Sequence, residues 1–246
     1  MEGFIVVFTY RLNIGLTAIP YHAAFHENSP IELQEHVTPE HLKQDPNNYL
    51  DHEQQIVKLL HSISDKELHK KYSKERTLRE FKQNIPAKIL TERIRPDIEH
   101  KMYRLVKLLA ISKVPAYFKQ SGYSNLYQND KLTVPAKPCE PIFRVDISNG
   151  EMHYSLQFKQ DDRVFTFNKQ PPLVICHDPA VLKAGQTLYH FEKFDSGKLK
   201  PFQEKPEIQL QGEKMIDTYM DKFISKVVEK FHVEGSGFEV NNITEK

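Results

Sequence analysis

The sequence has little of what marks exported, membrane-spanning or nucleotide-hydrolysing proteins. Its two cysteines are too few for a disulfide framework, which favours the cytoplasm. Its nine glycines fit neither GxxxxGK[ST] nor GxGxxG, so we expect no ATP hydrolysis by this chain alone. The strongest apolar run, Phe4 to Phe8, is far too short to cross a bilayer, so no membrane partner is expected. The start, Met1 to Gly3, lacks the basic residues of a secretory signal.

Patterns for metal binding or covalent catalysis are also absent. His22 and His26 are four residues apart but lack the glutamate of HExxH, and zinc needs three or four ligands. Cys176 precedes His177, with Cys139 as its only distant thiol partner, and there is no GxSxG motif. We therefore expect no catalytic residue, metal or cofactor in this chain. A stand-alone enzyme that uses Cys176 or a histidine cluster is the third and weakest hypothesis.

The composition is that of a globular protein with a sizeable core. The 246 residues are 39% hydrophobic and 27% charged, which suits one large domain or two small ones. In the first half, residues 4–10 and 16–25 predict a β-hairpin around turn residues 11–15. Residues 26–49 contain three prolines and are expected to be irregular, apart from a short helix that Thr38 caps and Pro39 begins.

Helical spacing dominates the next stretch. A helix is predicted from Asp51 to about Ile63, and Ser64 and Thr77 each stand three residues before a glutamate, as in a capping box. After Pro96, the apolar residues of 97–112 form one stripe of a helix that should stop near Lys113. Residues 116–138 are expected to be loop-like.

Short strands with turns between them follow from about 140 to 211 and predict an antiparallel meander. Asn149-Gly150 is the strongest hairpin signal among them. Residues 213–231 hold apolar spacing of three and four and predict a closing amphipathic helix. The prediction is an α+β fold, with a hairpin and helical basic region over 1–130 and a β-rich region with its closing helix over 131–246. The two regions could also form one continuous domain.

The net charge of +1 hides a strong segregation along the chain. Residues 1–65 have three basic and nine acidic residues, whereas residues 66–113 have 14 basic and six acidic, a net charge of +8. Such a block can bind phosphate backbones or acidic partners. The proposed nucleic-acid-binding residues are Lys70, Lys71, Lys74, Arg76, Arg79, Lys82, Arg93, Arg95, Lys101, Arg104 and Lys107.

Two other interpretations of this basic stretch stay open. It could be a solvated helix surface, neutralised by the acidic segment 27–65 next to it, or a docking face for an acidic protein. A second basic stripe, formed by Lys222, Lys226 and Lys230 on the last predicted helix, is expected to be a solvated face. The loop aromatics Tyr117, Phe118, Tyr123 and Tyr127 could stack on unpaired bases, but packing onto the domain is commoner for such residues.

Three segments resemble the N-terminal, pre-motor region of bacterial Swi/Snf-type helicase-like ATPases. They are residues 85–146, with the run IRPDIEHKMYRLVKLLAISKVPAYF, residues 187–202, TLYHFEKFDSGKLKPF, and residues 233–240, VEGSGFEV. These are ordinary residues rather than a catalytic signature. The strand-like residues 238–240 follow a glycine turn and have no visible pairing partner, so we expect the chain to be a piece of a longer protein.

The resemblance implies a DNA-dependent ATPase and translocase as the parent protein. Its motor domains would follow this chain and would bind the ATP and magnesium, since the family's ATPase motifs have no matching positions here. For this chain the resemblance implies a noncatalytic accessory role, in contact with DNA or with the motor domains of the same polypeptide. The alternative is a protein-interaction module with no DNA binding.

Overall fold

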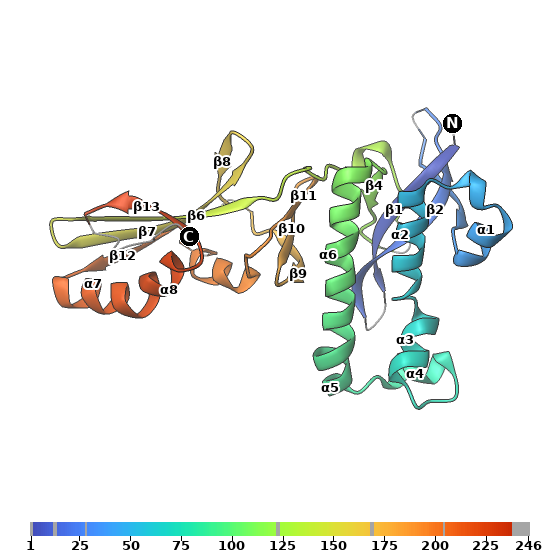
Figure 1. Ribbon diagram of the computed structural model, residues 1–246, viewed down its shortest axis with the longest axis horizontal. Coiled ribbons are helices and arrows are strands. Elements are labelled where there is room, and N and C mark those ends of the chain that lie inside the picture. The colour runs from blue at the N-terminus through green and yellow to red at the C-terminus, as the bar shows by residue number, and fades with distance from the viewer. Residues whose placement is uncertain are drawn as a thin grey trace.

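The computed structural model describes residues 2–11, 14–27, 29–121, 124–167, 170–203 and 205–237. It is a mixed α+β fold, as the sequence predicts. The molecule is elongated, with helices α1 to α6 and a first sheet at one end and a second sheet with its own helix at the other (Figure 1). In the described part of the chain, every helix is too short or too polar to cross a membrane.

The first sheet is built on the predicted hairpin, which is confirmed. Strands β1 (Glu2–Arg11) and β2 (Gly15–Ala24) pair antiparallel over their whole length. The other three strands of the sheet, which has the order β3-β2-β1-β4-β5, are β3 (Glu32–His36), β4 (Ala116–Phe118) and β5 (Lys131–Leu132). Strands β3 and β4 correct the sequence analysis, which expected irregular chain at both places. β4 runs parallel to β1, and this pairing partner lies more than a hundred residues away in the sequence.

The helices of the first half begin at the predicted caps. They are α1 (Pro39–Gln44), α2 (Asp51–His61), α3 (Asp65–Tyr72) and α4 (Leu78–Asn84), with a short 3-10 turn, η1 (Pro46–Asn48), after α1. Thr38, Ser64 and Thr77 are the N-cap residues of α1, α3 and α4. The hydroxyls of Ser64 and Thr77 each accept a hydrogen bond from the backbone N–H three residues on, which satisfies a donor that the helix leaves unpaired.

The long helix is longer than the sequence predicts. Three segments follow one another without a break, namely α5 (Ala87–Ile89), the π-helical turn η2 (Leu90–Ile94) and α6 (Arg95–Ser112). Pro96 was expected to precede the helix, but it lies inside the continuous helix, in the first turn of α6 and directly after η2. Its missing N–H therefore removes one helical hydrogen bond. The helix ends at Lys113, whose φ of 59° is left-handed, in agreement with the predicted stop.

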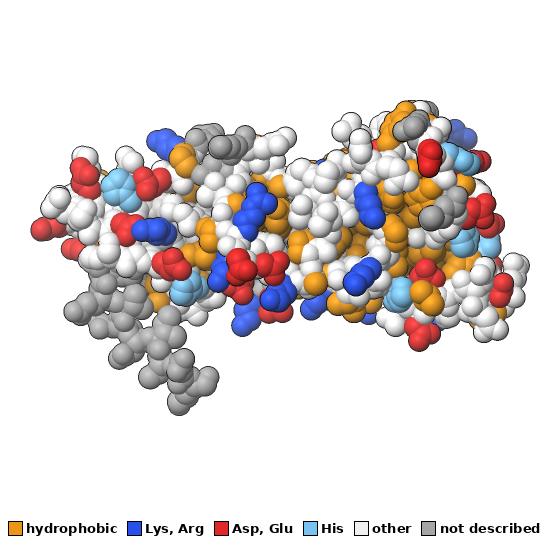
Figure 2. Space-filling view, turned by 90° about the horizontal axis from the view of Figure 1, so that it is seen from above, with side chains coloured by type: hydrophobic (Ala, Val, Ile, Leu, Met, Phe, Trp, Pro, Cys, Tyr) orange, Lys and Arg blue, Asp and Glu red, His pale blue; other side chains and the backbone are white. Residues whose placement is uncertain are grey.

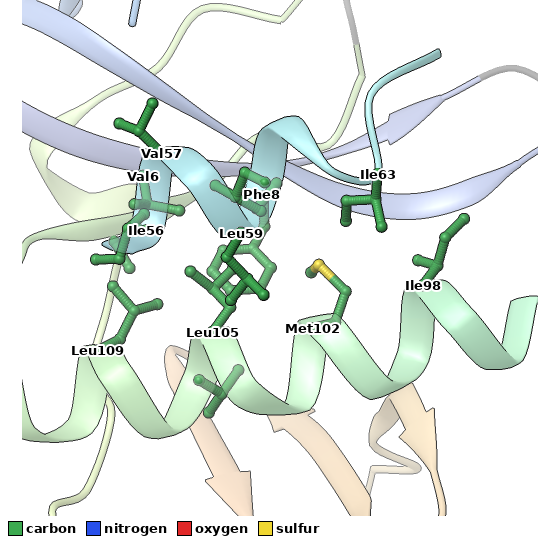
Figure 3. Close-up of a cluster of buried hydrophobic side chains, with 14 of the residues drawn as sticks. Val6, Phe8, Ile56, Val57, Leu59, Ile63, Ile98, Met102, Leu105 and Leu109 are labelled. Carbon is green, nitrogen blue, oxygen red and sulfur yellow. The ribbon is translucent and has the colours of Figure 1, made fainter. Parts of the chain in front are cut away.

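The first core lies between β1, α2 and α6 (Figure 3). Phe8 of β1, Ile56 of α2 and Leu105 of α6 are all fully buried. Val6 and Phe8 point from the sheet toward the helices, while Ile98, Met102, Leu105 and Leu109 form one stripe along α6 (Figure 3). The predicted apolar stripe of α6 therefore fixes which side of this helix is left for solvent.

The second sheet has the order β12-β7-β6-β13, with β8 also paired to β7. Its strands are β6 (Glu140–Ser148), β7 (Glu151–Gln160), β8 (Arg163–Phe165), β12 (Glu207–Gln211) and β13 (His232–Ser236). The predicted Asn149-Gly150 turn joins β6 to β7, and both residues have positive φ. β13 was not predicted; it pairs parallel with β6 from His232 to Ser236 and includes Gly235. The predicted strand at 238–240 lies outside the described residues.

One face of the second sheet is covered by the predicted closing helix. This helix runs through α7 (Glu213–Tyr219), the π-helical turn η5 (Met220–Ile224) and α8 (Ser225–Val228), and a 3-10 segment, η4 (Ser196–Phe202), packs beside it. Alternate residues of β7, such as Tyr154 and Leu156, face the core that forms there, and their neighbours face solvent.

A small third sheet joins the two halves. Its strands are β9 (Leu173–His177), β10 (Ala180–Ala184) and β11 (Thr187–His190). Cys176 and Val181 pack into the first core against α6, whereas Ala180 and Leu182 pack into the second core. This sheet lies beside α6 in Figure 1, so that each of its faces is buried by a different half of the molecule.

Candidate nucleic-acid interface

The structure gathers nine of the eleven predicted basic residues at one end of the first half. This end, formed by α3, the 73–77 loop, α4 and the start of the long helix, is the lower end of that half in Figure 1. We call it the basic end, and its residues are Lys70, Lys71, Lys74, Arg76, Arg79, Lys82, Arg93, Arg95 and Lys101. Residues 25 positions apart meet there, because α3 folds back against the start of α6 and its Tyr72 hydroxyl donates a hydrogen bond to Asp97.

Asp97 engages two of these cations. Its carboxylate lies 2.8 Å from Lys71 Nζ and 3.0 Å from Lys101 Nζ, and it accepts a hydrogen bond of 2.9 Å from Tyr72. Burial by itself would raise the pKa of Asp97, but the hydrogen bonds from Lys71, Lys101 and Tyr72 outweigh burial and lower it. Lys71 and Tyr72 therefore help to dock α3 on α6, whereas Lys101 pairs with Asp97 within α6.

Asp65 engages a third cation. It forms ion pairs with Lys82 of α4 and with Arg11 of β1, and Arg11 also donates a hydrogen bond of 2.7 Å to the Ile63 carbonyl. Burial lowers the pKa of Arg11 to about 10. Asp65 is the first residue of α3, and among the described residues it is the one member of the acidic segment 27–65 that forms an ion pair with a predicted basic residue.

Most of the predicted basic residues have no carboxylate partner. Within the described ranges, eight of the eleven form no ion pair and are exposed to solvent, namely Lys70, Lys74, Arg76, Arg79, Arg93, Arg95, Arg104 and Lys107. The acidic segment 27–65 therefore neutralises one of the predicted basic residues, Lys82, by a direct ion pair within the described ranges. The surface keeps a large excess of unpaired positive charge.

Arg104 and Lys107 lie apart from the basic end, farther along the exposed side of α6. At 1.5 Å per residue, Lys107 is roughly 18 Å along the helix axis from Arg95. Both share a helical face with Arg93, and Lys107 Nζ lies 5.8 Å from the Tyr103 ring centroid. The structure thus divides the predicted set into a cluster and a strip that leads away from it.

The opposite side of the molecule shows no comparable cluster. In the view from above (Figure 2), Lys and Arg side chains are interspersed with acidic and neutral ones. The loop aromatics do not form a stacking platform beside the basic end either. Tyr117 is buried in β4 and Phe118 is half-buried, so for them the expected packing onto the domain is confirmed, whereas Tyr127 is exposed. Tyr123 lies outside the described residues.

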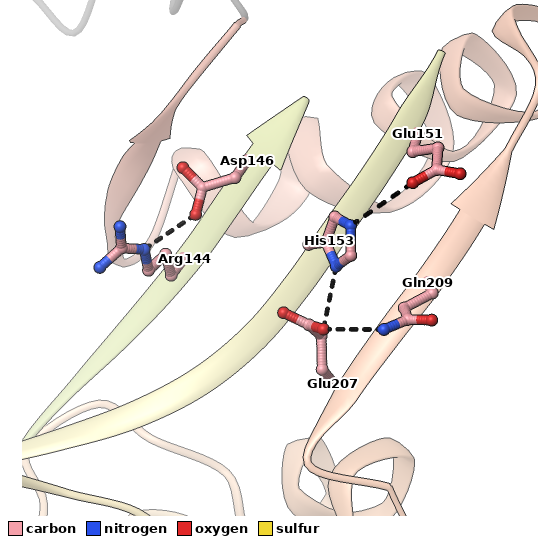
Figure 4. Close-up of polar contacts among 6 residues, drawn as sticks. All are labelled: Arg144, Asp146, Glu151, His153, Glu207 and Gln209. Carbon is pink, nitrogen blue, oxygen red and sulfur yellow. Dashed lines mark hydrogen bonds and ion pairs between the residues drawn. The ribbon is translucent and has the colours of Figure 1, made fainter. Parts of the chain in front are cut away.

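The outer face of the second sheet is polar but self-paired (Figure 4). Arg144 forms an ion pair of 2.9 Å with Asp146, and His153 Nδ1 lies 2.9 Å from Glu207 on the neighbouring strand β12. The hydrogen bond to Glu207 raises the pKa of His153 and outweighs the small effect of burial. Sequence analysis did not single out these residues, because a pair across two strands 54 positions apart has no local signal.

Of the residues considered for catalysis or metal binding, Cys176, His22 and His177 are buried or hydrogen-bonded within the fold. Cys176 is buried in β9 as predicted, its thiol donates a hydrogen bond of 3.3 Å to the Glu99 carbonyl, and burial raises its pKa. His22 Nε2 lies 2.9 Å from the Tyr49 hydroxyl. Among the described residues, no group of three or more histidine, cysteine or acidic side chains is arranged to hold a metal ion. His177 Nδ1 lies 2.8 Å from Ser196 Oγ, but no carboxylate in the described ranges orients the ring through its other nitrogen.

Comparison with known protein families, with curated proteins and with solved structures finds no match.

Proposed function

We propose that this chain is a noncatalytic DNA-binding region and that its basic end contacts the phosphates of duplex DNA. The observation that supports this most directly is the set of eight exposed cations without carboxylate partners in the described ranges. Binding to a polyanion releases condensed counterions, and this gain needs no base-specific contact. Most of these cations stand on helices fixed by the first core, and Lys74 and Arg76 stand in the 73–77 loop between α3 and α4, so the backbone that presents most of the charge is already ordered before binding.

The resemblance to the pre-motor region of Swi/Snf-type ATPases suggests the setting. In this proposal the chain is an accessory region of a DNA-dependent ATPase and regulates or positions the motor on DNA. ATP and magnesium belong to motor domains of the same polypeptide, and this chain supplies no catalytic group. The proposed place of action is the cytoplasm.

The test is fluorescence anisotropy with a labelled 30-base-pair duplex, titrated from low to physiological salt. The variant combines Lys70→Ala, Lys74→Ala, Arg76→Ala and Arg79→Ala. It spares Lys71 and Lys82, because both form ion pairs that help to hold the fold. The log–log dependence of affinity on salt should become shallower by about 0.9 for each phosphate contact that is lost.

A matched control removes four exposed cations from the second half of the chain, with the changes Lys159→Ala, Arg163→Ala, Lys200→Ala and Lys205→Ala. This control has the same net charge as the first variant, so it separates a local contact from a general charge effect. Equal salt slopes for the two variants would contradict the proposal. No binding by the unmodified chain, even at low salt, would favour the protein-interaction module instead.

A further inference from the structure

The second half of the molecule contains an aromatic groove beside the closing helix. The groove has a volume of about 240 Å³ and lies between η4, the second sheet and the helix. Its aromatic residues are Phe143, Tyr154, Phe202, Tyr219 and Phe223. This volume is below the several hundred Å³ of a typical cofactor site, so it suits one flat ring or side chain better than a whole cofactor.

The rings of this groove form a continuous series from the core to the surface. Phe143 stacks on Tyr154 with centroids 6.0 Å apart, Tyr154 meets Tyr219 at 6.0 Å, and Tyr219 meets Phe223 at 4.8 Å. Phe143 is 1% exposed, whereas Phe223 is 55% exposed. Phe223 is the one phenylalanine of the described chain that is so open to solvent. The series therefore ends in an exposed ring, Phe223, that packs against the half-buried Tyr219.

Lysines line the groove and no carboxylate does. Lys198 comes from η4, and Lys222 and Lys226 come from the closing helix, so the cations reach the groove from two elements. None of the three forms an ion pair within the described residues, and Lys198 Nζ lies 5.4 Å from the centroid of Phe231. Lys222 and Lys226 belong to the stripe that the sequence analysis assigned to a solvated face. The groove gives this stripe an aromatic neighbour that the sequence alone does not show.

The groove also contains two tyrosine hydroxyls, of Tyr154 and Tyr219, that can form hydrogen bonds with a ligand. The Tyr154 side chain is 5% exposed, but its hydroxyl is not one of the fully buried polar atoms left without a partner, so its tip is open to the groove. Among the described residues, neither Tyr154 nor Tyr219 has a hydrogen-bond partner for its hydroxyl. Burial raises the pKa of both hydroxyls, so both stay protonated and can donate at neutral pH. A ligand with polar edges could therefore be bound by donors as well as by rings.

We infer that this groove binds single-stranded nucleic acid, with an unpaired base stacked at Phe223 and its flanking phosphates near Lys198, Lys222 and Lys226. Exposed rings beside cations are the usual platform for single strands, since every base has a π-face and every linkage has a negative charge. An acidic peptide would match the lysines too, but the spare donors and exposed ring favour a base. The site is separate from the basic end and does not depend on duplex binding there.

The test uses a labelled 20-nucleotide oligo(dT) and a matched oligonucleotide in which abasic linkers replace the bases. The unmodified chain should bind oligo(dT) more tightly than the abasic strand. Phe223→Ala should weaken oligo(dT) binding by about five- to a hundredfold and leave abasic binding unchanged, because stacking is lost and the phosphates are not. Phe223→Tyr keeps a ring and should restore the affinity. Since Phe223 is half exposed, neither change should unfold the protein, which circular dichroism checks.

Several results would overturn the inference. They are no binding of oligo(dT) at low salt, equal affinity for the two strands, or an unchanged oligo(dT) affinity in Phe223→Ala. The basic-end variant with Lys70, Lys74, Arg76 and Arg79 changed to Ala keeps the two sites distinguishable. It should lose duplex affinity and retain the preference for oligo(dT) over the abasic strand. Photo-cross-linking of 5-iododeoxyuridine to Tyr219 or Phe223 gives an independent readout.

Discussion

The two charged surfaces of this molecule are organised in opposite ways. At the basic end, cations stand on helices and on the loop between α3 and α4, and most have no carboxylate partner in the described ranges. On the outer face of the second sheet, charges of both signs pair with one another. Arg144 pairs with Asp146 along strand β6, and His153 pairs with Glu207 on the neighbouring strand. A face that satisfies its own charges gains little from a charged partner, whereas in the proposed DNA complex the basic end would gain through counterion release.

The largest expected effect on duplex affinity comes from the exposed face of the long helix, which Arg93 of the basic end shares with Arg104 and Lys107 of the strip. Charge reversal at Arg93→Glu, Arg104→Glu and Lys107→Glu should weaken duplex binding by more than tenfold at low salt, because attraction becomes repulsion along one face of α6. The same anisotropy assay measures it. Arg144→Glu with Lys159→Glu on the sheet face is the control and should change binding much less. If both variants lose affinity equally, the comparison between a binding face and a self-paired face fails.

Asp97 gives a smaller effect, seen mainly in stability. Asp97→Asn should destabilise the fold by about 1–2 kcal/mol, because two lysines and Tyr72 lose a charged acceptor that is largely shielded from water. Urea denaturation measures this change. Since the folded pKa is lowered, the contribution of Asp97 is complete above its unfolded pKa near 4 and is lost as the pH falls through the folded value. The variant should therefore approach the unmodified chain in stability at strongly acidic pH.

Asp97→Asn also tests whether the charge of the basic end or the orientation of α3 determines duplex affinity. It removes a negative charge from the basic end and releases Lys71 and Lys101, so duplex affinity should stay equal or rise in any variant that remains folded. A clear loss of affinity with intact circular dichroism would mean that the orientation of α3 on α6 matters more for binding than its charge does.

The smallest expected effect is on the sheet face. Glu207→Gln should lower the pKa of His153 toward its ordinary value, because the neutral amide no longer stabilises the imidazolium. NMR titration of the His153 ring measures this shift. The folded pKa is raised, so the advantage of the unmodified chain is present below the unfolded pKa of about 6.5 and is lost as the pH rises through the folded value. Duplex binding should not change, and an unshifted His153 would contradict the assigned pair.

What the sequence predicts of the fold depends on how local each signal is. The β1–β2 hairpin, the caps at Ser64 and Thr77 and the stripe of α6 are confirmed, because residues within a few positions of one another determine them. Strands β4 and β13 were missed, since each is short and pairs with a strand far away in the sequence.

For the candidate sites too, local features are visible in the sequence and contacts between distant residues are not. The cations of 66–113 are visible in the sequence, but Asp97 joins Lys71 to Lys101 only once α3 folds back on α6. The aromatic groove was missed entirely. Lys222 and Lys226 stand on the last helix and Lys198 on η4, while Phe143 and Tyr154 come from strands more than sixty residues before that helix lysine pair.

The long helix has a mechanical consequence for the proposed contact with DNA. From Ala87 to Ser112 it is a rod of roughly 39 Å, supported by the first core on one side and by the β9–β11 sheet on another. A rod held on two sides does not bend easily, so a pull on the cations near Arg95 displaces it as one piece. The sheet that shares its other face with the second core must then take up the load. Because residues of the β9–β11 sheet pack into both cores, we expect tension applied at one end of the molecule to reach the other end through this sheet.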